Sequence, residues 1–348
     1  MADILIRGAG VFGLSIAWEC LKRGARVTVV DPHGVAAGAS GGLVGALAPH
    51  IPENWNDKKA LQFDSLERAE GFWAEVAAAS GKDPGYARLG RLQPLADAHA
   101  VTLARARGTG AADHWQGRHA WEVVAADPDL CPSPTGLMIR DTLTARVHPR
   151  RATRALATAV LARGGRIEAQ DDDATGIEIE ATGVAGLAAL SARFGQDVGN
   201  GVKGQAALLD CDLRDRPQVF ADGVHIVPHA DGTVAIGSTS ERDYDTPDGT
   251  DDQLDALVER ARAACPALAR AEVIDRWAGV RPRARSRAPM LGAHPARPGA
   301  FIANGGFKIG FGMAPICAVL IADLVLEGVD RIPESFRPGA SLPKPAGK

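Results

Sequence analysis

Apolar and polar positions in the first 31 residues follow a pattern that predicts a strand, a helix and a second strand. Residues 4–6 form a short apolar run, residues 11–21 carry apolar side chains at helical spacing, and residues 27–30 form a second apolar run that ends at Asp31. The first run is separated from the helix by the sequence Gly-Ala-Gly-Val-Phe-Gly at residues 8–13. The pattern therefore predicts a β-α-β unit whose first turn is rich in glycine.

This turn has the glycine spacing that binds a dinucleotide. The first glycine makes the tight turn, the second lets the backbone approach a pyrophosphate, and the third allows the helix to pack closely. The phosphates would face the helix N-terminus, and a carboxylate at the end of the second strand would accept hydrogen bonds from the adenosine ribose. The unit predicts an ADP-containing cofactor, bound by Gly8, Gly10, Val11, Phe12, Gly13 and Asp31. Arg7 stands where an apolar residue is usual, and the sequence offers no reason for it.

Residues 34–50 are unusually poor in bulky side chains. Glycine and alanine let a backbone approach a ligand closely and let several N–H groups point at a phosphate or a ring edge. A flexible linker is the less favoured interpretation, because Leu43, Val44 and Leu47 are apolar. We therefore expect a flat, wide ligand against this stretch, contacted by Ala39, Ser40, Gly42, Leu43 and Gly45.

The rest of the chain mixes helix and strand patterns. Helices are predicted at residues 58–80, 147–165 and 251–264, with a final apolar helix near the C-terminus. Strands are predicted at residues 166–169, 176–181, 206–209, 225–228 and 233–236, and residues 86–146 are predicted to form short strands and loops. Thr182 and Gly183 form a second turn suited to close backbone approach.

Length and composition narrow the class of protein. A chain of 348 residues can form two domains or one discontinuous domain with an insertion. A net charge of −3 with both signs mixed gives no case for nucleic acid or a membrane surface as partner. No apolar run is expected to reach the roughly 18 residues of a membrane-spanning helix, and no signal segment precedes the first strand, so we expect a cytoplasmic protein. The five cysteines lie far apart, which favours buried free thiols over disulfides or a metal site.

The C-terminal quarter contains Gly279-x-Arg281-Pro282, Pro289-x-x-Gly292 and the glycine-rich segment 305–312. Together with the N-terminal unit, the small-residue stretch, His148-Pro149-Arg150, Thr182-Gly183 and His225-Ile-Val-Pro228, this order resembles the D-amino-acid oxidase and glycine oxidase family of flavoproteins along nearly the whole chain. The Gly306-Phe307-Lys308 loop is similar to that of the related sarcosine oxidases. The resemblance implies that the cofactor is FAD rather than NAD.

The resemblance also implies roles for individual residues. Arg281 matches the arginine that holds the substrate carboxylate, for which a planar guanidinium is suited. Lys308 matches a residue that helps to hold this carboxylate, although a solvated lysine at the rim is equally compatible with the sequence. His225 stands where glycine oxidase carries a tyrosine over the substrate, and it either binds substrate or is a simple strand histidine. The flavin would also contact Thr182, Gly183, Gly305, Gly306, Phe307, Lys308 and Ile309.

The arginines at 283, 285 and 287 are expected to be solvated or structural, because together with Arg281 they would place four mutually repelling charges in one pocket. Attachment of FAD is expected to be noncovalent, because no cysteine stands in the attachment motif of the related enzymes.

The expected fold is α/β: a discontinuous Rossmann-type FAD-binding domain, formed by residues 1–85, 147–203 and 276–348, and an antiparallel-sheet substrate domain, formed by residues 86–146 and 204–275. The expected activity is oxidation of a C–N bond beside a carboxylate in a glycine, D-amino acid or sarcosine type of substrate. A hydride would pass to flavin N5, the imine would hydrolyse to an oxo acid, and oxygen or a respiratory carrier would accept the electrons. Two alternatives are oxidation of a 2-hydroxy acid and a flavoprotein subunit that is active only with a partner.

Overall fold

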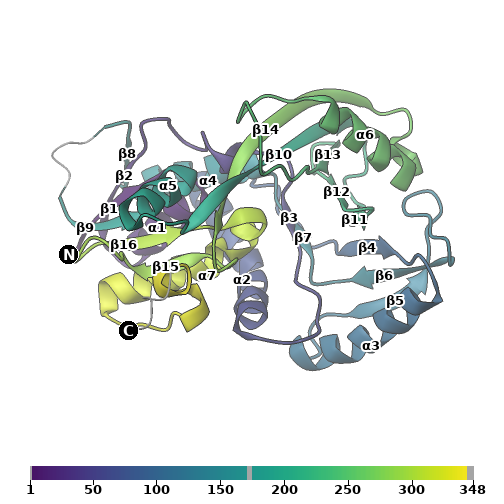
Figure 1. Ribbon diagram of the computed structural model, residues 1–348, viewed down its shortest axis with the longest axis horizontal. Helices are drawn as coiled ribbons and strands as arrows, with labels where there is room; N and C mark the ends of the chain where they lie inside the picture. The colour runs from purple at the N-terminus through teal and green to yellow at the C-terminus, as the bar shows by residue number, and fades with distance from the viewer. Residues whose placement is uncertain (1, 171–174, 343–348) are drawn as a thin grey trace.

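Two β-sheets organise the protein, and they lie side by side in Figure 1. The computed structural model describes residues 2–170 and 175–342. Within those residues the first sheet has six strands, in the spatial order β15 (Met290–Ala293), β16 (Phe301–Asn304), β9 (Ile177–Glu180), β1 (Asp3–Arg7), β2 (Arg26–Val30) and β8 (Arg166–Glu168). The second has eight strands, in the order β14 (Glu272–Ala284), β10 (Gly199–Asp210), β13 (Thr233–Gly237), β12 (Val224–Pro228), β11 (Gln218–Ala221), β4 (Arg91–Pro94), β6 (Leu137–Asp141) and β5 (Trp121–Ala125).

The six-stranded sheet is parallel except at β15, which pairs antiparallel with β16. A shared hydrophobic core joins one face of this sheet to α1 (Val11–Lys22), α2 (Asp57–Ser80), α4 (Pro149–Ala162) and α7 (Gly310–Ala322). The other face packs against α5 (Gly183–Phe194) through Leu187 and Leu190. Helices on both faces of a mostly parallel sheet form the Rossmann-type arrangement that the glycine turn predicted.

The eight-stranded sheet is antiparallel except where β4 pairs with β11. Its outer face packs against α6 (Asp252–Ala264), where Leu254 and Leu257 meet Val219, Ile226 and Ile236. Side chains alternate between the two faces of a strand, so the neighbours Phe220 and His225 point to the opposite, inner face. The α/β class with a second, antiparallel sheet is therefore confirmed.

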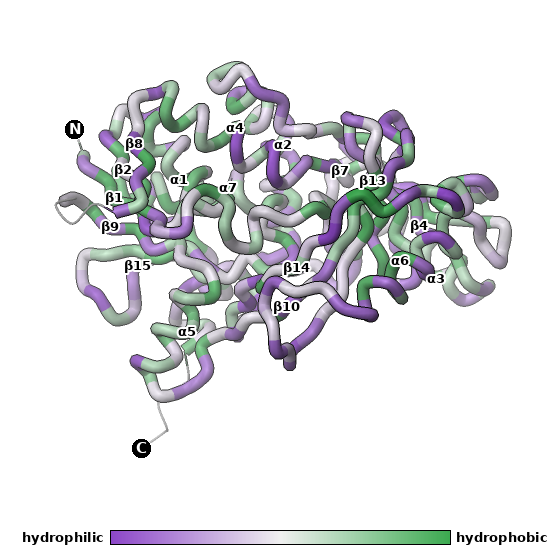
Figure 2. Tube along the Cα trace, turned by 90° about the horizontal axis from the view of Figure 1, so that it is seen from above, coloured by the Kyte–Doolittle hydropathy of each residue, from purple (hydrophilic) through white to green (hydrophobic). Residues whose placement is uncertain are grey.

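The long strands β10 and β14 form the edge of the second sheet that lies nearest the first sheet in both views (Figures 1 and 2). They pair with each other from Gly199 to Asp210 and from Glu272 to Ala284. The predicted domain junctions after residues 203 and 275 fall inside these strands. We propose that the two domains are joined there by continuous strands instead of linkers. Residues 171–174 and 343–348 of the predicted FAD-binding domain lie outside the described residues.

The sequence pattern missed two helices. No helix was predicted at residues 183–194, where α5 lies. Residues 86–146 were predicted to hold strands and loops, but α3 (Ala98–His114) lies among them. Only Val101, Ala104 and Ala111 of this helix are buried, so it has almost no apolar stripe to detect. Its two glycines lower helix propensity, yet a Cβ on Gly108 would lie 2.9 Å from the carbonyl oxygen of Trp121.

The other predicted helices lie close to their predicted bounds. Strand β10 is longer than the strand predicted at 206–209, and no strand bounds were predicted for β11, β14, β15 or β16. The helix predicted at 147–165 is shorter, because His148 caps it, Pro149 begins it and it ends at Ala162. Strand β2 ends at Val30, one residue before Asp31. Arg281 lies inside β14, three residues before its last residue.

The expectation about membrane-spanning length was wrong for one segment. The continuous helical segment Phe307–Glu327 has 21 residues and a mean hydropathy of 2.2, which passes the length and composition test for a spanning helix. In the folded protein 61% of its most apolar stretch of 18 residues is buried, and Met313 and Cys317 belong to the core against α1 and α2. Burial in a protein core explains the same composition.

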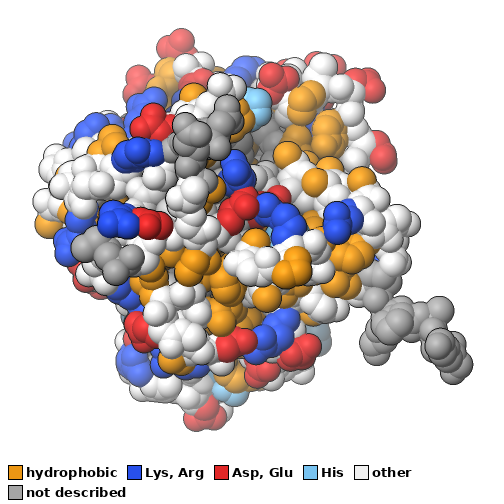
Figure 3. Space-filling model, turned by 90° about the vertical axis from the view of Figure 1, so that its left-hand side faces the viewer, with side chains coloured by type: hydrophobic (Ala, Val, Ile, Leu, Met, Phe, Trp, Pro, Cys, Tyr) orange, Lys and Arg blue, Asp and Glu red, His pale blue; other side chains and the backbone are white. Residues whose placement is uncertain are grey.

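The structure supplies a reason for Arg7. Its Nε lies 2.5 Å from Glu178 Oε1, and Arg297 also pairs with Glu178 (2.9 Å) and with Glu180 (2.5 Å). Because β1 and β9 pair in parallel, their carboxyl ends, which carry Arg7 and Glu180, lie side by side. Figure 3, which views the end of the molecule that holds this sheet, shows basic and acidic side chains beside each other.

Candidate active site

The glycine turn between β1 and α1 is shaped by contacts that exclude side chains. Gly8 has φ of +113°, and a Cβ on it would lie 2.4 Å from the carbonyl oxygen of Ala181. A Cβ on Gly13 would lie 1.9 Å from the carbonyl oxygen of Gly8, so α1 can approach the turn only with glycine there. Because Gly10 and Val11 line the adjoining cavity, the positive end of the α1 dipole opens onto it.

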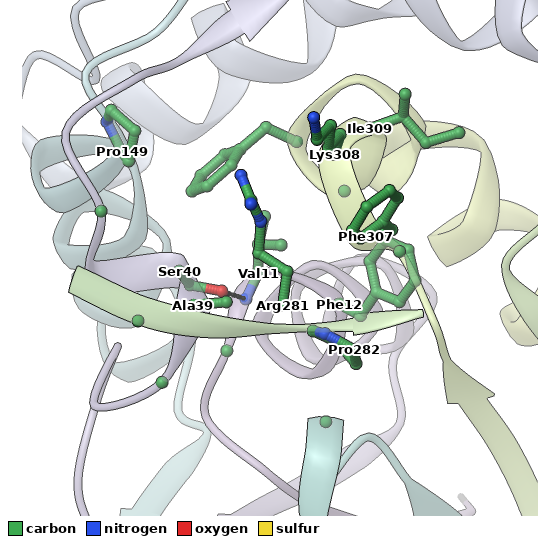
Figure 4. Close-up of a pocket in the computed structure, with 18 of the residues that line it drawn as sticks. Val11, Phe12, Ala39, Ser40, Pro149, Arg281, Pro282, Phe307, Lys308 and Ile309 are labelled. Atoms are coloured by element: carbon green, nitrogen blue, oxygen red, sulfur yellow. Dashed lines mark hydrogen bonds between the residues drawn. The ribbon is translucent and has the colours of Figure 1, made fainter. Parts of the chain in front are cut away.

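Asp31 and Ser40 hold this turn in place. Asp31 accepts hydrogen bonds from the Ala9 N–H (2.8 Å, on Oδ2) and from the His33 N–H (3.0 Å, on Oδ1). Ser40 Oγ accepts the Val11 N–H at 2.9 Å, as the dashed line in Figure 4 marks. Each carboxylate oxygen keeps a second lone pair, so Asp31 can support the turn and still accept a ribose hydroxyl.

Neighbouring protein atoms account for part of the small-residue stretch. A Cβ on Gly45 would lie 2.0 Å from the carbonyl oxygen of Val147, and one on Gly42 would lie 3.3 Å from the ring of Trp277. The expectation that a ligand alone demands small residues here was therefore too strong. The stretch nevertheless lines the cavity along residues 37–50.

A single cavity of about 1090 Å³ lies between the two sheets and collects the predicted residues. Every predicted site residue except Gly13 lines it: Gly8, Gly10, Val11, Phe12, Asp31, Ala39, Ser40, Gly42, Leu43, Gly45, Thr182, Gly183, His225, Arg281, Gly305, Gly306, Phe307, Lys308 and Ile309. In Figure 4 the Arg281 side chain rises from β14 into the cavity, while Phe307 and Lys308 lie beside it on the neighbouring segment. Gly13 lies behind the turn, where it serves packing.

Arg281 is nearly buried and is fixed by uncharged acceptors. Its Nη2 donates to the carbonyl oxygens of Lys203 (3.1 Å) and Thr239 (2.8 Å), and its Nη1 donates to Ser238 Oγ (2.5 Å). No carboxylate of the described chain lies within ion-pair distance of it, and its buried Nε has no partner there. Burial lowers the pKa of Arg281 to about 10, and the charge of Glu241 opposes this shift. The guanidinium is therefore charged and uncompensated.

A buried polar network lies directly behind Arg281. Glu241 pairs with Lys203 (Oε2 to Nζ, 3.3 Å), accepts from Gln205 Nε2 (3.1 Å) and bonds to Thr239 Oγ1. Backbone hydrogen bonds between Lys203 and Glu241 bridge the same two segments. None of these side chains lines the cavity. The network fixes the Lys203 and Thr239 carbonyls that hold Arg281.

Lys308 lies among the residues that line the cavity, and its role there stays a prediction. Its side chain is exposed, and the exposed surface belongs to the cavity lining. Desolvation and the nearby positive charge of Arg281 both lower the pKa of Lys308. Phe307 lies between the cations, with its ring centroid 5.6 Å from Arg281 Cζ and 5.7 Å from Lys308 Nζ. Arg283 lies over the same ring, but it does not line the cavity.

His225 is neutral at physiological pH. Burial, followed by the positive charges of Arg91 and Lys308, lowers the pKa of His225 to about 3. Its ring lies 4.5 Å from that of Phe220, and its buried Nδ1 has no hydrogen-bond partner among the described residues. His225 can therefore exchange hydrogen bonds with a ligand without adding positive charge.

The sequence did not indicate Arg91, Phe220 or the network of Lys203 and Glu241. Arg91 and Phe220 become neighbours of His225 because β4, β11 and β12 are adjacent in the sheet. No local motif marks these positions, so only the strand pairing reveals them. The contact of Trp277 with Gly42 was also not foreseen.

Comparison with known proteins agrees with this geometry. Residues 3–324 match the model of a family described as "DAO: FAD dependent oxidoreductase". The glycine oxidase of Geobacillus kaustophilus is 28% identical over 357 residues, which covers 93% of this chain and 92% of that protein. The crystal structure of glycine oxidase from the same species has a TM-score of 0.81 at 24% identity and covers 97% of this chain and 98% of that one.

A second solved structure, iminodiacetate oxidase from Chelativorans sp. BNC1, has a TM-score of 0.82 at 22% identity, with 96% of this chain and 98% of that chain covered. At this identity the likeness shows a shared fold. The family match spans most of the chain and includes the glycine turn, the small-residue stretch and Arg281. This chain is therefore an enzyme that belongs to the DAO family of FAD-dependent oxidoreductases.

Proposed function

We propose that this enzyme oxidises the C–N bond of a small amino acid or N-substituted amino acid, with noncovalently bound FAD as cofactor. The observation that carries the proposal is that Arg281 and Lys308 line the same cavity, which begins at the glycine turn. Both are cations, and neither has a carboxylate partner among the described residues. Relatives named glycine oxidase that span more than nine-tenths of the chain support an amine substrate.

The cavity fits FAD on several counts. Its volume of about 1090 Å³ accommodates a large cofactor together with a small substrate. The glycine turn, Val11 and Phe12 would hold the pyrophosphate, and Asp31 would hold the adenosine ribose. Residues 39–45 and 305–309, with Thr182 and Gly183, would hold the remainder against the inner face of the second sheet. Cys317 is fully buried in α7, away from the cavity, so it offers no covalent link.

Arg281 and Lys308 would bind the substrate carboxylate and so orient the adjacent α-carbon. Their charges also stabilise negative charge that develops on the cofactor side during reduction. When bound, FAD supplies the acceptor for the hydride that leaves the α-carbon. The product imine then hydrolyses to an oxo acid and ammonia or an amine. Neutral His225 can hydrogen-bond the substrate without repelling a second cation.

Anaerobic titration of the purified yellow protein tests this function. Glycine, sarcosine, D-alanine and L-alanine should be compared with D-lactate and L-lactate while the flavin absorbance is recorded. We expect at least one amino acid to bleach the flavin and neither lactate to do so. Bleaching by lactate alone would replace the proposal with hydroxy-acid oxidation, and bleaching by no compound in the panel would overturn it.

The electron acceptor and the mode of cofactor binding have separate tests. Admission of air after bleaching should restore the yellow colour and form hydrogen peroxide if oxygen is the acceptor; recovery only with a quinone or dye would indicate a respiratory carrier. Acid precipitation should release all flavin into the supernatant as FAD. Flavin that stays in the pellet would contradict noncovalent binding.

A further inference from the structure

The cavity continues past His225 to a buried arginine that the proposed chemistry does not use. Arg91 lies on β4, Phe220 on β11 and His225 on β12, which are consecutive strands of the eight-stranded sheet, and all three line the cavity. Arg281, at the reacting end of the cavity, lies on β14, which is the edge strand of this sheet and is separated from β12 by β10 and β13. The cavity is therefore longer than glycine or sarcosine requires.

Arg91 presents free hydrogen-bond donors in this extension. Its side chain is 6% exposed, and its Nε donates to Asp141 Oδ2 at 2.9 Å. Asp141 is fully buried, and its second oxygen accepts the N–H of Thr144 at 2.9 Å. Among the described residues no hydrogen bond joins Nη1 or Nη2 of Arg91 to an acceptor, and Arg91 lines the cavity. Asp141 thus fixes the guanidinium from behind and leaves its far edge available.

The charge around this extension favours an anion. Arg91 lowers the pKa of His225, so its positive field reaches the cavity despite the nearby Asp141. The only carboxylates among the described lining residues are Asp31, which is bound at the glycine turn, and Asp248, which lies on the loop before α6. A carboxylate at Arg91 would receive charge-assisted hydrogen bonds in a buried setting, where such bonds are strong.

We infer that Arg91 forms a second carboxylate subsite, and that the enzyme acts on amino acids that carry a second carboxylate on the side chain or the N-substituent. The inference rests on the proposed function for the first carboxylate, at Arg281 and Lys308. His225 lies on β12, between β14 and β4 in the strand order, and it lines the same cavity as Arg281 and Arg91, so it lies along the path between the two subsites. The substrate therefore needs a chain of several atoms that passes His225 to join its two carboxylates.

Binding of unreactive acids tests the subsite without turnover. Dicarboxylates from succinate to adipate and monocarboxylates of the same chain length should be titrated into the holoenzyme while the flavin absorbance is recorded. We expect at least one dicarboxylate to bind about 10-fold or more tightly than its matched monocarboxylate, as a charge-assisted hydrogen bond implies. Dicarboxylates that bind no better than monocarboxylates at any length would overturn the inference.

Variants assign the effect to Arg91. Arg91→Lys keeps a cation beside Asp141 but removes the terminal guanidinium nitrogens. The ratio of the monocarboxylate Kd to the matched dicarboxylate Kd should therefore fall towards one. Arg140→Lys is the matched control, because Arg140 lies opposite Leu92 on β6 and is exposed. Flavin content and melting temperature of both variants report whether the fold is intact. If Arg91→Lys fails to fold, the double variant Arg91→Met/Asp141→Asn removes the subsite without leaving an unpaired buried carboxylate.

Turnover separates this inference from the proposed function. The kcat/KM of D-glutamate, D-2-aminoadipate, iminodiacetate and N-(3-carboxypropyl)glycine should be compared with that of D-norvaline and N-propylglycine. The best diacid should exceed its neutral counterpart, and Arg91→Lys should lower this ratio by roughly 10- to 100-fold. Oxidation of neutral amino acids with an unchanged ratio would refute the subsite and leave the function intact. No oxidation of any amine would refute the function itself.

Discussion

Nη2 of Arg281, on β14, donates to the backbone carbonyl oxygen of Thr239 at 2.8 Å. Thr239 lies in the segment that follows β13. This bond fixes a charged side chain by a neutral group, so the positive charge stays available to a ligand. A carboxylate in the same place would have neutralised it. The arrangement explains how a buried arginine can serve as a binding group, and it leads to predictions about both partners.

Replacement of Arg281 by lysine should damage the enzyme although the charge is kept. A lysine has neither the planar fork nor the reach to hold the Thr239 and Lys203 carbonyls while it binds a carboxylate. We expect kcat/KM for the best amino acid to fall by about 100-fold, the equivalent of about 2.7 kcal/mol, with normal flavin content. Near-normal kcat/KM in an Arg281→Lys sample with full FAD content would remove Arg281 from the site.

Glu241 should act as a positioning residue for Arg281. Glu241→Gln keeps the shape but removes the charge that faces Lys203, and it loosens the segment that carries the Thr239 carbonyl. We expect the Kd of benzoate to rise about 5- to 10-fold, a loss of about 1 kcal/mol, and KM to change more than kcat. Asp243→Asn, two residues further on and exposed, is the control. Equal benzoate affinity in the two variants would show that the network has no such role.

Lys308→Met should change the flavin as well as the substrate. The ammonium on the cavity wall favours negative charge on the reduced cofactor, so its loss should lower the midpoint potential. We expect a decrease of about 30 mV or more, the equivalent of about 1.4 kcal/mol for a two-electron couple, together with weaker acetate binding. If potential and acetate affinity both match the wild type at full flavin occupancy, the charge of Lys308 does not act at the site.

Gly13→Ala should abolish cofactor binding although Gly13 does not line the cavity. A Cβ would meet the Gly8 carbonyl oxygen at 1.9 Å and push α1 away from the turn. We expect the purified variant to hold less than about a tenth of the wild-type FAD, because close helix packing shapes the phosphate site. Gly71→Ala, where a Cβ meets no atom within 4 Å, should retain its FAD. A yellow, fully loaded Gly13→Ala protein would contradict this account.

Acid should destabilise the fold before most carboxylates titrate. Burial lowers the pKa of His225 to about 3 and that of His229 to about 4, whereas an unfolded histidine titrates near 6.5. Below about pH 6.5 the unfolded chain therefore binds protons that the folded chain does not, and stability falls as the pH decreases. The slope approaches about 1.4 kcal/mol per pH unit for each group.

Urea unfolding between pH 7 and pH 5 measures this slope, and His225→Gln should reduce it. The stabilising effect of neutral His225 is complete above pH 6.5, so the two proteins should show the same pH dependence there. A slope that the variant leaves unchanged would mean that His225 is protonated in the folded protein.

Local sequence was sufficient for the nucleotide unit and for most elements. The glycine turn can be predicted from a few neighbouring residues, because Gly8 adopts a positive φ and Gly13 packs against the carbonyl oxygen of Gly8 in the same turn. Helical spacing in residues 58–80 likewise reports a local apolar face, and α2 follows at Asp57–Ser80. Resemblance to a family added Arg281 and Lys308, which no local pattern would have distinguished from surface cations.

Only the tertiary structure determined which distant residues share the cavity and what holds them. Arg91 comes beside His225 through the pairing of β4 with β11, and its link to Asp141 depends on the pairing of β4 with β6. The network of Glu241 and Lys203 behind Arg281 also joins segments that are remote along the chain. Strand order and register create these contacts, and they result from the packing of the whole chain. The sequence by itself thus determined the cofactor unit and most element types, whereas the folded sheet decided which distant residues meet around the cavity.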